Sequence, residues 1–179
     1  MNAPDQTLHD AILRLEAAGI DYMLTGSVAL NYYTHPRATL DVDLVVALYL
    51  RDAINIVEIF GPGFYVSPEA AKEAVLHQSC FNAIHQDTFL KVDLMIRKRE
   101  EYRLLEFERR RRISYKGFEV WIVSKEDLIL SKLDWGKESI SQKQIADAQN
   151  LIVSGCDMEY LHLWSARLNL TDMLTRATP

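Results

Sequence analysis

The chain has 179 residues, of which 49% are hydrophobic and 25% are charged, and its formal net charge is -5. A chain of this length and composition can bury a sizeable core, which excludes an intrinsically disordered protein and removes the need for disulfides. The negative net charge argues against a broad nucleic-acid surface, because such a surface needs an excess of lysine and arginine.

Targeting and redox features of the sequence indicate a cytoplasmic protein. The N-terminus lacks the basic and apolar segments of a signal peptide. No apolar run approaches the roughly 20 residues that a membrane span needs, so we expect no membrane partner. The two cysteines, Cys80 and Cys156, have no metal-ligand spacing, and such sparse use fits a reducing compartment.

The first half of the chain alternates between helical and strand-like patterns. Apolar residues recur at helical spacing in residues 6–18 and alternate with acids in residues 40–48. Turn residues separate such segments. The expected elements are a helix at 6–18, a strand at 20–24, a turn at 25–27, a helix at 28–33, a strand at 40–48 and a helix at 51–60.

The second half begins with a well-marked helix and ends in a helical region. Ser67 is a good N-cap for a helix that begins at Pro68 and runs to about His77. The remaining expected elements are an antiparallel pair of strands at 80–86 and 89–96, a strand at 118–123, and helices from a cap at Ser124 to the end, with breaks near 137–141 and 154–155.

Strands concentrate in the first two thirds of the chain and helices in the last third. This order predicts an α/β (α+β) fold, with a mixed β-sheet flanked by helices and a helical lobe at the C-terminus. We place the core domain at residues 1–123 and the helical lobe, packed on the core, at residues 124–179.

Asp41 and Asp43 are the strongest functional signal. Residues two apart on a strand face the same side of a sheet, and the apolar neighbours of this pair suggest a strand inside the core. Two such carboxylates repel and are costly to bury unless a cation neutralises them. Mg²⁺ supplies that charge, because carboxylates and substrate phosphates often hold it together. An edge strand with one solvated face would give the same pattern.

Asp93 lies in a second apolar strand and would complete the site. If that strand lies beside the strand of Asp41 and Asp43, three carboxylates converge as a two-metal phosphoryl-transfer site requires. One ion would orient the phosphates, and the other would lower the pKa of an attacking hydroxyl. Asp93 would bind the second ion and act as, or assist, the general base.

The pair Gly26-Ser27 follows a strand and opens a helix. Backbone N–H groups at a helix N-terminus favour anions, and glycine lets a phosphate approach closely. The Ser27 hydroxyl can donate to a phosphate oxygen. A Gly-Ser pair alone is usually a turn, so its functional interpretation depends on the acids that follow it.

Together these residues resemble the nucleotidyltransferase superfamily related to DNA polymerase beta. The resemblance rests on Thr25 to Ala29, Arg37 to Leu44 and Val92 to Leu94, which match a Gly-Ser pair, an acid-x-acid pair and a later third acid. It covers about residues 20–96. The chain is most similar to a small bacterial branch that includes abortive-infection toxin-like nucleotidyltransferases.

The C-terminal region also resembles that branch, over residues 124–133 and 143–147. The resemblance implies that Lys132 and Asp147 approach the nucleotide, whereas a solvated lysine and a surface aspartate would look the same in sequence. Arg37, between the Gly-Ser pair and the acids, either contacts phosphate or pairs with a carboxylate.

The resemblance implies an enzyme that moves a nucleoside monophosphate from a nucleoside triphosphate and releases pyrophosphate. Up to two Mg²⁺ ions, with Mn²⁺ as the alternative ion, are expected on the catalytic residues Asp41, Asp43 and Asp93. The expected nucleotide-binding residues are Gly26, Ser27, Arg37, Lys132 and Asp147. The acceptor stays open among RNA, protein and small molecules, and a toxin-like enzyme with an antitoxin-like protein partner is one expectation.

Two rival functions stay open. One is an antibiotic-modifying enzyme of the same superfamily, which needs a deep acceptor pocket. The other is a catalytically silent protein of this fold that binds a partner, and the retained acids count against it. The arginine run at 109–112 could bind phosphates, but such a run is more often a solvated helix end.

Overall fold

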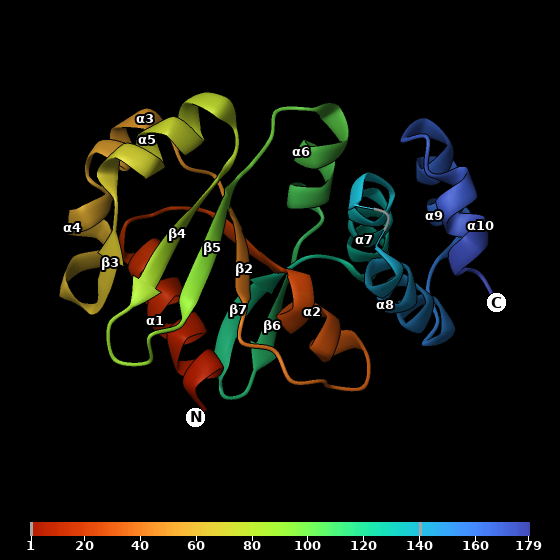
Figure 1. Ribbon diagram of the computed structural model, residues 1–179, viewed down its shortest axis with the longest axis horizontal. Coiled ribbons are helices and arrows are strands. Elements are labelled where there is room, and N and C mark those ends of the chain that lie inside the picture. The colour runs from red at the N-terminus through yellow and green to blue at the C-terminus, as the bar shows by residue number, and fades with distance from the viewer. Residues whose placement is uncertain (1, 140) are drawn as a thin grey trace. The chain divides into compact units, whose positions relative to one another are not determined.

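The computed structural model describes residues 2–139 and 141–179 (Figure 1). The chain divides into two compact units: the first comprises Met1–Val28 and Ala38–Ile122, and the second Ala29–Arg37 and Val123–Pro179. The domain boundary placed after residue 123 stays a prediction. Every helix within the described ranges is too short or too polar to span a lipid bilayer.

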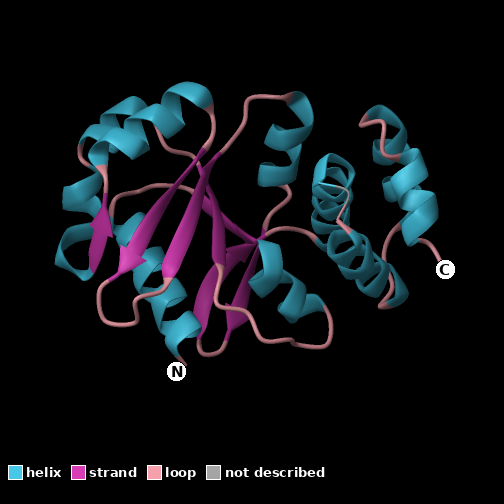
Figure 2. Ribbon diagram, in the orientation of Figure 1, coloured by secondary structure: helices cyan, strands magenta, loops and turns pink. Residues whose placement is uncertain are grey.

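The first unit is built on a seven-stranded sheet (Figure 2). Its strands are β1 (Tyr22–Thr25), β2 (Val42–Val46), β3 (Phe64–Val66), β4 (Cys80–His85), β5 (Lys91–Ile96), β6 (Arg111–Tyr115) and β7 (Phe118–Ile122). They lie in the order β3-β4-β5-β2-β1-β7-β6. The pairs β2/β5 and β1/β7 are parallel and the other pairs antiparallel, which confirms the mixed sheet.

Helices of the first unit flank this sheet. They are α1 (Ala3–Ala17), α3 (Leu50–Ile54), α4 (Ile56–Phe60), the 3₁₀ helix η1 (Gly61–Gly63), α5 (Pro68–His77) and α6 (Glu101–Glu108). The cap of α5 is as expected, because the Ser67 hydroxyl accepts a hydrogen bond from the Ala70 N–H at 3.1 Å.

One face of the sheet forms the core of the first unit. In β2, Val42, Leu44 and Val46 are fully buried, and alternate residues of β4 and β5 follow the same pattern. They pack against α1 and α5, and Leu8 and Leu15 of α1 are fully buried. Because side chains alternate along a strand, Asp43 and Asp93 lie on the other face.

Several elements differ from the expectations. The strand expected at 40–48 is shorter, and the helix expected at 51–60 splits at Asn55, which ends α3 and precedes α4. β6 forms inside the arginine-rich stretch and was not expected from the sequence. Its residues are mostly exposed at the sheet edge, where charged side chains are tolerated.

The second unit is helical, as expected. It holds most of α2 (Gly26–Tyr33), together with α7 (Lys125–Ser139), α8 (Gln142–Val153), α9 (Met158–Arg167) and α10 (Thr171–Ala177). The Ser124 hydroxyl accepts from the Asp127 N–H at 3.2 Å, which confirms the cap of α7. The break expected near 154–155 lies between α8 and α9, and residue 140 of the other expected break lies outside the described residues.

Candidate active site

Asp43 and Asp93 are direct neighbours in the sheet. The parallel strands β2 and β5 pair in register with Asp43 opposite Asp93, so the expectation that the two strands lie side by side is confirmed. Adjacent strands lie about 4.8 Å apart, which places both carboxylates in one cluster. The row continues to Thr25 on β1 and to Asn82 on β4.

Asp41 lies outside the strand. β2 begins at Val42, and Asp41 is exposed while Asp43 is half-buried. The prediction that both acids lie in a buried strand is therefore wrong for Asp41. The physical reason is that the ladder with β5 starts at the Val42–Val92 pair, so the backbone before it has no strand partner there.

Lys91 supplies a positive charge to the acids. Its ammonium donates to Asp93 Oδ2 at 3.0 Å, and this hydrogen bond, with the nearby carboxylate of Asp41, raises the pKa of Lys91. The other oxygen, Asp93 Oδ1, is buried and has no hydrogen-bond partner within the part of the chain that the structure describes. Sequence reasoning missed Lys91, although its position two residues before Asp93 places it on the same face.

Gly26 lies against the same cluster. Its φ is +64°, in the left-handed region that favours glycine. A Cβ at this position would overlap the Asp43 carboxylate and lie 2.6 Å from Asp43 Cγ. Gly26 begins α2 directly after β1, as expected, so Gly26 and Ser27 stand at a helix N-terminus beside the acids.

The residues present fit a divalent cation. Over the described part of the chain, no three His, Cys, Asp or Glu side chains are gathered as a ready metal site. Nevertheless, Asp93 has an unpartnered buried oxygen, and the Lys91 ammonium stands where a cation is needed. Carboxylate oxygens are the ligands that Mg²⁺ prefers, so Asp43 and Asp93, with the exposed Asp41, can hold it once Asp93 turns from Lys91.

Exposed side chains extend from the acids across the sheet. The next row on this face joins Lys91 to Ile84 and Tyr65, and the latter two are 40% and 63% exposed. Phe89, in the turn before β5, is 83% exposed and has a φ of +57°. A bulky residue with positive φ is an outlier, and such strain often accompanies a functional position.

In the second unit, the three other predicted nucleotide contacts form one cluster. Asp147 Oδ2 accepts from Lys132 Nζ at 3.0 Å and from Arg37 Nη2 at 3.1 Å. The Lys132 and Asp147 side chains are both 7% exposed, so the solvated alternative is wrong. Asn31 also holds the Arg37 backbone through two hydrogen bonds of 2.8 and 3.0 Å. Their contact with a nucleotide stays a prediction.

The arginine run joins the end of α6 to β6, so it is a helix end only in part. Arg109 caps α6, but β6 already begins at Arg111. The Arg110 guanidinium packs 4.2 Å from the centroid of the Phe107 ring and donates to Asp21 at 3.1 Å. These contacts give Arg110 a structural role within the first unit.

No protein-family model and no curated protein matches the chain. Several solved structures do match it. The lincosamide antibiotic adenylyltransferase LnuA, with lincomycin bound, has a TM-score of 0.52 and 16% identity, over 82% of this chain and 94% of LnuA. The antibiotic-resistance factor ANT(2″)-Ia has a TM-score of 0.54 and 15% identity, over 90% and 89% of the two chains.

A further match is to a nucleotidyltransferase-like protein. An antigenic nucleotidyltransferase-like protein from Paracoccidioides brasiliensis has a TM-score of 0.54 and 18% identity, over 96% of this chain and 92% of that chain. The chain has the nucleotidyltransferase fold. Identities this low establish the fold alone, because one fold can carry different chemistries.

Proposed function

We propose that the chain is a metal-dependent nucleotidyltransferase that moves a nucleoside monophosphate from a nucleoside triphosphate to an acceptor hydroxyl. The observation that carries the proposal is the in-register pair of Asp43 and Asp93, with Gly26 against Asp43. Two adjacent acids beside a helix N-terminus offer a cation site and an anion site together.

Gly26 and Ser27 hold the donor phosphates in this proposal. The N–H groups at the start of α2 point toward an anion, and the Ser27 hydroxyl adds a donor. The close fit of Gly26 to Asp43 brings the phosphates next to the acids. In the second unit, Asp147 Oδ2 accepts hydrogen bonds from both Lys132 and Arg37, and contact of these three residues with a nucleotide stays a prediction of the sequence.

Asp93 is the proposed general base. The acceptor oxygen attacks the α-phosphorus, a new P–O bond forms, and the bond to pyrophosphate breaks. The hydroxyl proton passes to the Asp93 carboxylate. Bound Mg²⁺, or Mn²⁺, would neutralise the phosphate charge and lower the pKa of the hydroxyl. Asp41 and Asp43 hold the donor side of the cation site.

The exposed row beyond Asp93 is the proposed acceptor side. Ile84, Tyr65 and Phe89 offer apolar and aromatic surface next to the base. RNA, protein and small-molecule acceptors all fit this general description. A toxin-like role and an antitoxin-like partner stay predictions of the sequence.

An antibiotic acceptor is the second candidate. Two of the matching structures are an antibiotic adenylyltransferase and an antibiotic-resistance factor, and LnuA is lincomycin-bound. Transfer of labelled nucleotide to lincomycin tests this candidate directly. Transfer to RNA or protein with none to lincomycin would favour the other acceptors.

Binding of nucleotide tests the core of the proposal. The protein is titrated with each of the common nucleoside triphosphates, with and without Mg²⁺, beside Asp43→Asn and Asp93→Asn. We expect Mg²⁺-dependent binding that both substitutions abolish and that the surface substitution Asp172→Asn preserves. Absence of metal-dependent binding to any triphosphate would contradict the proposal and favour a catalytically silent binding protein.

A further inference from the structure

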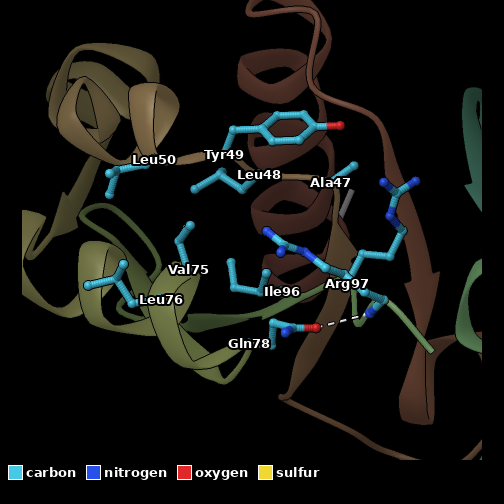
Figure 3. A pocket seen from close by; sticks show the side chains of 10 residues that line it. Ala47, Leu48, Tyr49, Leu50, Val75, Leu76, Gln78, Ile96 and Arg97 are labelled. Carbon is cyan, nitrogen blue, oxygen red and sulfur yellow. Dashed lines mark hydrogen bonds between the residues drawn. The ribbon is translucent and has the colours of Figure 1, made fainter.

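A cavity of about 450 Å³ lies at the opposite end of β2 and β5 from the acids (Figure 3). Because these strands are parallel, both end at the same edge of the sheet, at Val46 and Ile96. Its lining includes Tyr49, Leu50, Leu76, Gln78, Arg97 and Arg99, and we call these six residues the arginine groove. Arg97 lies four residues beyond Asp93, about 13 Å along a strand.

One side of the arginine groove is apolar and exposed. Tyr49, Leu50 and Leu76 are 52%, 46% and 61% exposed, and Figure 3 shows Leu50 and Leu76 grouped on one side. The apolar surface continues past the cavity to Ile54, which is one helical turn from Leu50 and 57% exposed. Contiguous exposed apolar side chains of this kind commonly mark an interaction site.

The other side of the groove is basic. Over residues 2–139 and 141–179, neither the Arg97 nor the Arg99 guanidinium has a carboxylate within ion-pair distance. The Arg97 guanidinium lies 5.0 Å from the centroid of the Phe107 ring, which restricts the side chain. In a chain with a net charge of -5, unpaired arginines beside leucines form a local positive region.

The backbone that carries these arginines is fixed. The Arg97 N–H donates to the Val46 carbonyl at 2.9 Å, and the Arg99 N–H donates to Gln78 Oε1 at 3.0 Å. Gln78 itself ends α5 in the left-handed conformation, with a φ of 49°. The backbone of the groove is therefore in place before a partner binds, which lowers the ordering cost of binding.

We propose that the arginine groove binds a segment of another protein in which acidic side chains alternate with large apolar ones. The acidic groups pair with Arg97 and Arg99, and an apolar side chain enters between Leu50 and Leu76. A small anion would fill the cavity but leave Ile54 exposed. A nucleic acid would satisfy the arginines but bring no aliphatic group to the leucines.

Selection from random peptides displayed on phage tests the partner chemistry. The full chain is the target, and recovered peptides are titrated against it by fluorescence anisotropy. We expect enrichment of peptides with Asp or Glu beside Leu, Ile or Phe. Binding should weaken about tenfold or more in Arg97→Glu with Arg99→Glu, and in Leu76→Asp, because truncation of central contacts commonly costs this much.

Matched variants outside the groove distinguish binding at the groove from nonspecific electrostatic and hydrophobic binding. Arg111→Glu and Leu163→Asp change exposed residues of the same types outside the groove and should leave peptide binding unchanged. If Leu76→Asp fails to fold, as judged by circular dichroism, Leu50→Asp replaces it. None of these residues belongs to the proposed active site, so nucleotide binding should persist in every variant.

Five outcomes would overturn the proposal. Selection without enrichment, enrichment of basic or neutral peptides, and binding that ignores the groove substitutions each contradict it. The fourth is binding of the apolar anion 1-anilinonaphthalene-8-sulfonate to the groove while no peptide is recovered, which would identify a small-molecule site. Concentration-dependent dimerisation lost in Arg97→Glu with Arg99→Glu would instead assign the groove to a second copy of the chain and also contradict it.

Discussion

Two clusters of charged side chains, one in each unit, use similar residues in opposite ways. In the first unit, Asp43 and Asp93 lie on a partly exposed sheet face, Lys91 forms an ion pair with Asp93, and Asp93 Oδ1 has no hydrogen-bond partner among the described residues. In the second unit, one oxygen of the buried Asp147 accepts hydrogen bonds from both Lys132 and Arg37.

The difference supports the proposed cation site in the first cluster and an ion network that stabilises the second unit. A carboxylate that is buried without a hydrogen-bond partner destabilises the folded protein. An unpartnered oxygen such as Asp93 Oδ1 is therefore expected where a bound ligand can interact with it. A carboxylate that accepts hydrogen bonds from two cationic side chains is already satisfied. Its removal leaves the buried cation without a counter-charge. We therefore expect substitutions in the first cluster to remove activity and those in the second to remove stability.

The largest expected effect is loss of transfer in Asp43→Asn and Asp93→Asn. Each substitution removes a charge that the cation site needs. We expect the rate of nucleotide transfer to fall about a thousandfold, which corresponds to a rise of about 4 kcal/mol in the activation free energy. Transfer of label from a nucleoside triphosphate into RNA, protein and small-molecule fractions measures it. Unfolding curves that match wild type, together with retained transfer, would contradict the assignment of the acids.

Asp147→Asn should act on stability. The substitution leaves the buried Lys132 ammonium without its counter-charge, and breaking such a pair costs about 3 kcal/mol in the free energy of unfolding. Urea denaturation measures it, with the exposed Asp172→Asn as control. A stability close to wild type combined with weaker nucleotide binding would assign Asp147 to the nucleotide instead.

Gly26→Ala should reduce both the stability of the protein and its nucleotide binding. Its left-handed φ costs about 1–2 kcal/mol with any side chain, and the new Cβ also displaces the Asp43 carboxylate. Gly19→Ala is the matched control, because Gly19 has a φ of +66° and no atom within 4 Å of the added Cβ. Only Gly26→Ala should lose Mg²⁺-dependent nucleotide binding, and equal binding in the two variants would sink the steric argument.

Lys91→Met should strengthen divalent-cation binding to the nucleotide-free protein. The Lys91 ammonium competes with a divalent cation for Asp93 Oδ2. Because the lysine side chain is 48% exposed, we expect the cation affinity to rise by only about fivefold. Mn²⁺ titration followed by electron paramagnetic resonance measures the affinity, with Lys98→Met as the control. Unchanged or weaker Mn²⁺ binding would show that Lys91 does not compete for this site.

The smallest effect concerns Cys80, an exposed thiol on the same sheet face. Partial burial and then the Asp93 carboxylate raise the pKa of Cys80 to about 11. A cation bound at Asp43 and Asp93 would offset the carboxylate contribution, lower this pKa and increase the thiolate fraction. We expect Mg²⁺ to increase the rate of Cys80 alkylation a few-fold, which corresponds to less than about 1 kcal/mol in the activation free energy. Cys156 is the internal control, and equal Mg²⁺ effects on both thiols would place the cation elsewhere.

The sequence by itself determined the local features of the protein. Ser67 and Ser124 cap helices through bonds that span three residues. Alternation of apolar residues predicted β2, and a turn between two segments predicted the antiparallel pair of β4 and β5. The order of Gly26, Asp43 and Asp93 along the chain indicated the fold that the structural matches show. These features depend on neighbours along the chain, which the sequence displays directly.

Only the tertiary structure decided which distant groups meet. The register that sets Asp43 opposite Asp93, the ion pairs on Asp147 and the exposure of Asp41 all depend on where strands and helices pack. The contact of Gly26 with Asp43 arises because β1 and β2 pair antiparallel, with Thr25 opposite Asp43. Such contacts join segments far apart along the chain, and their geometry is fixed by burial of the common core rather than by local preference.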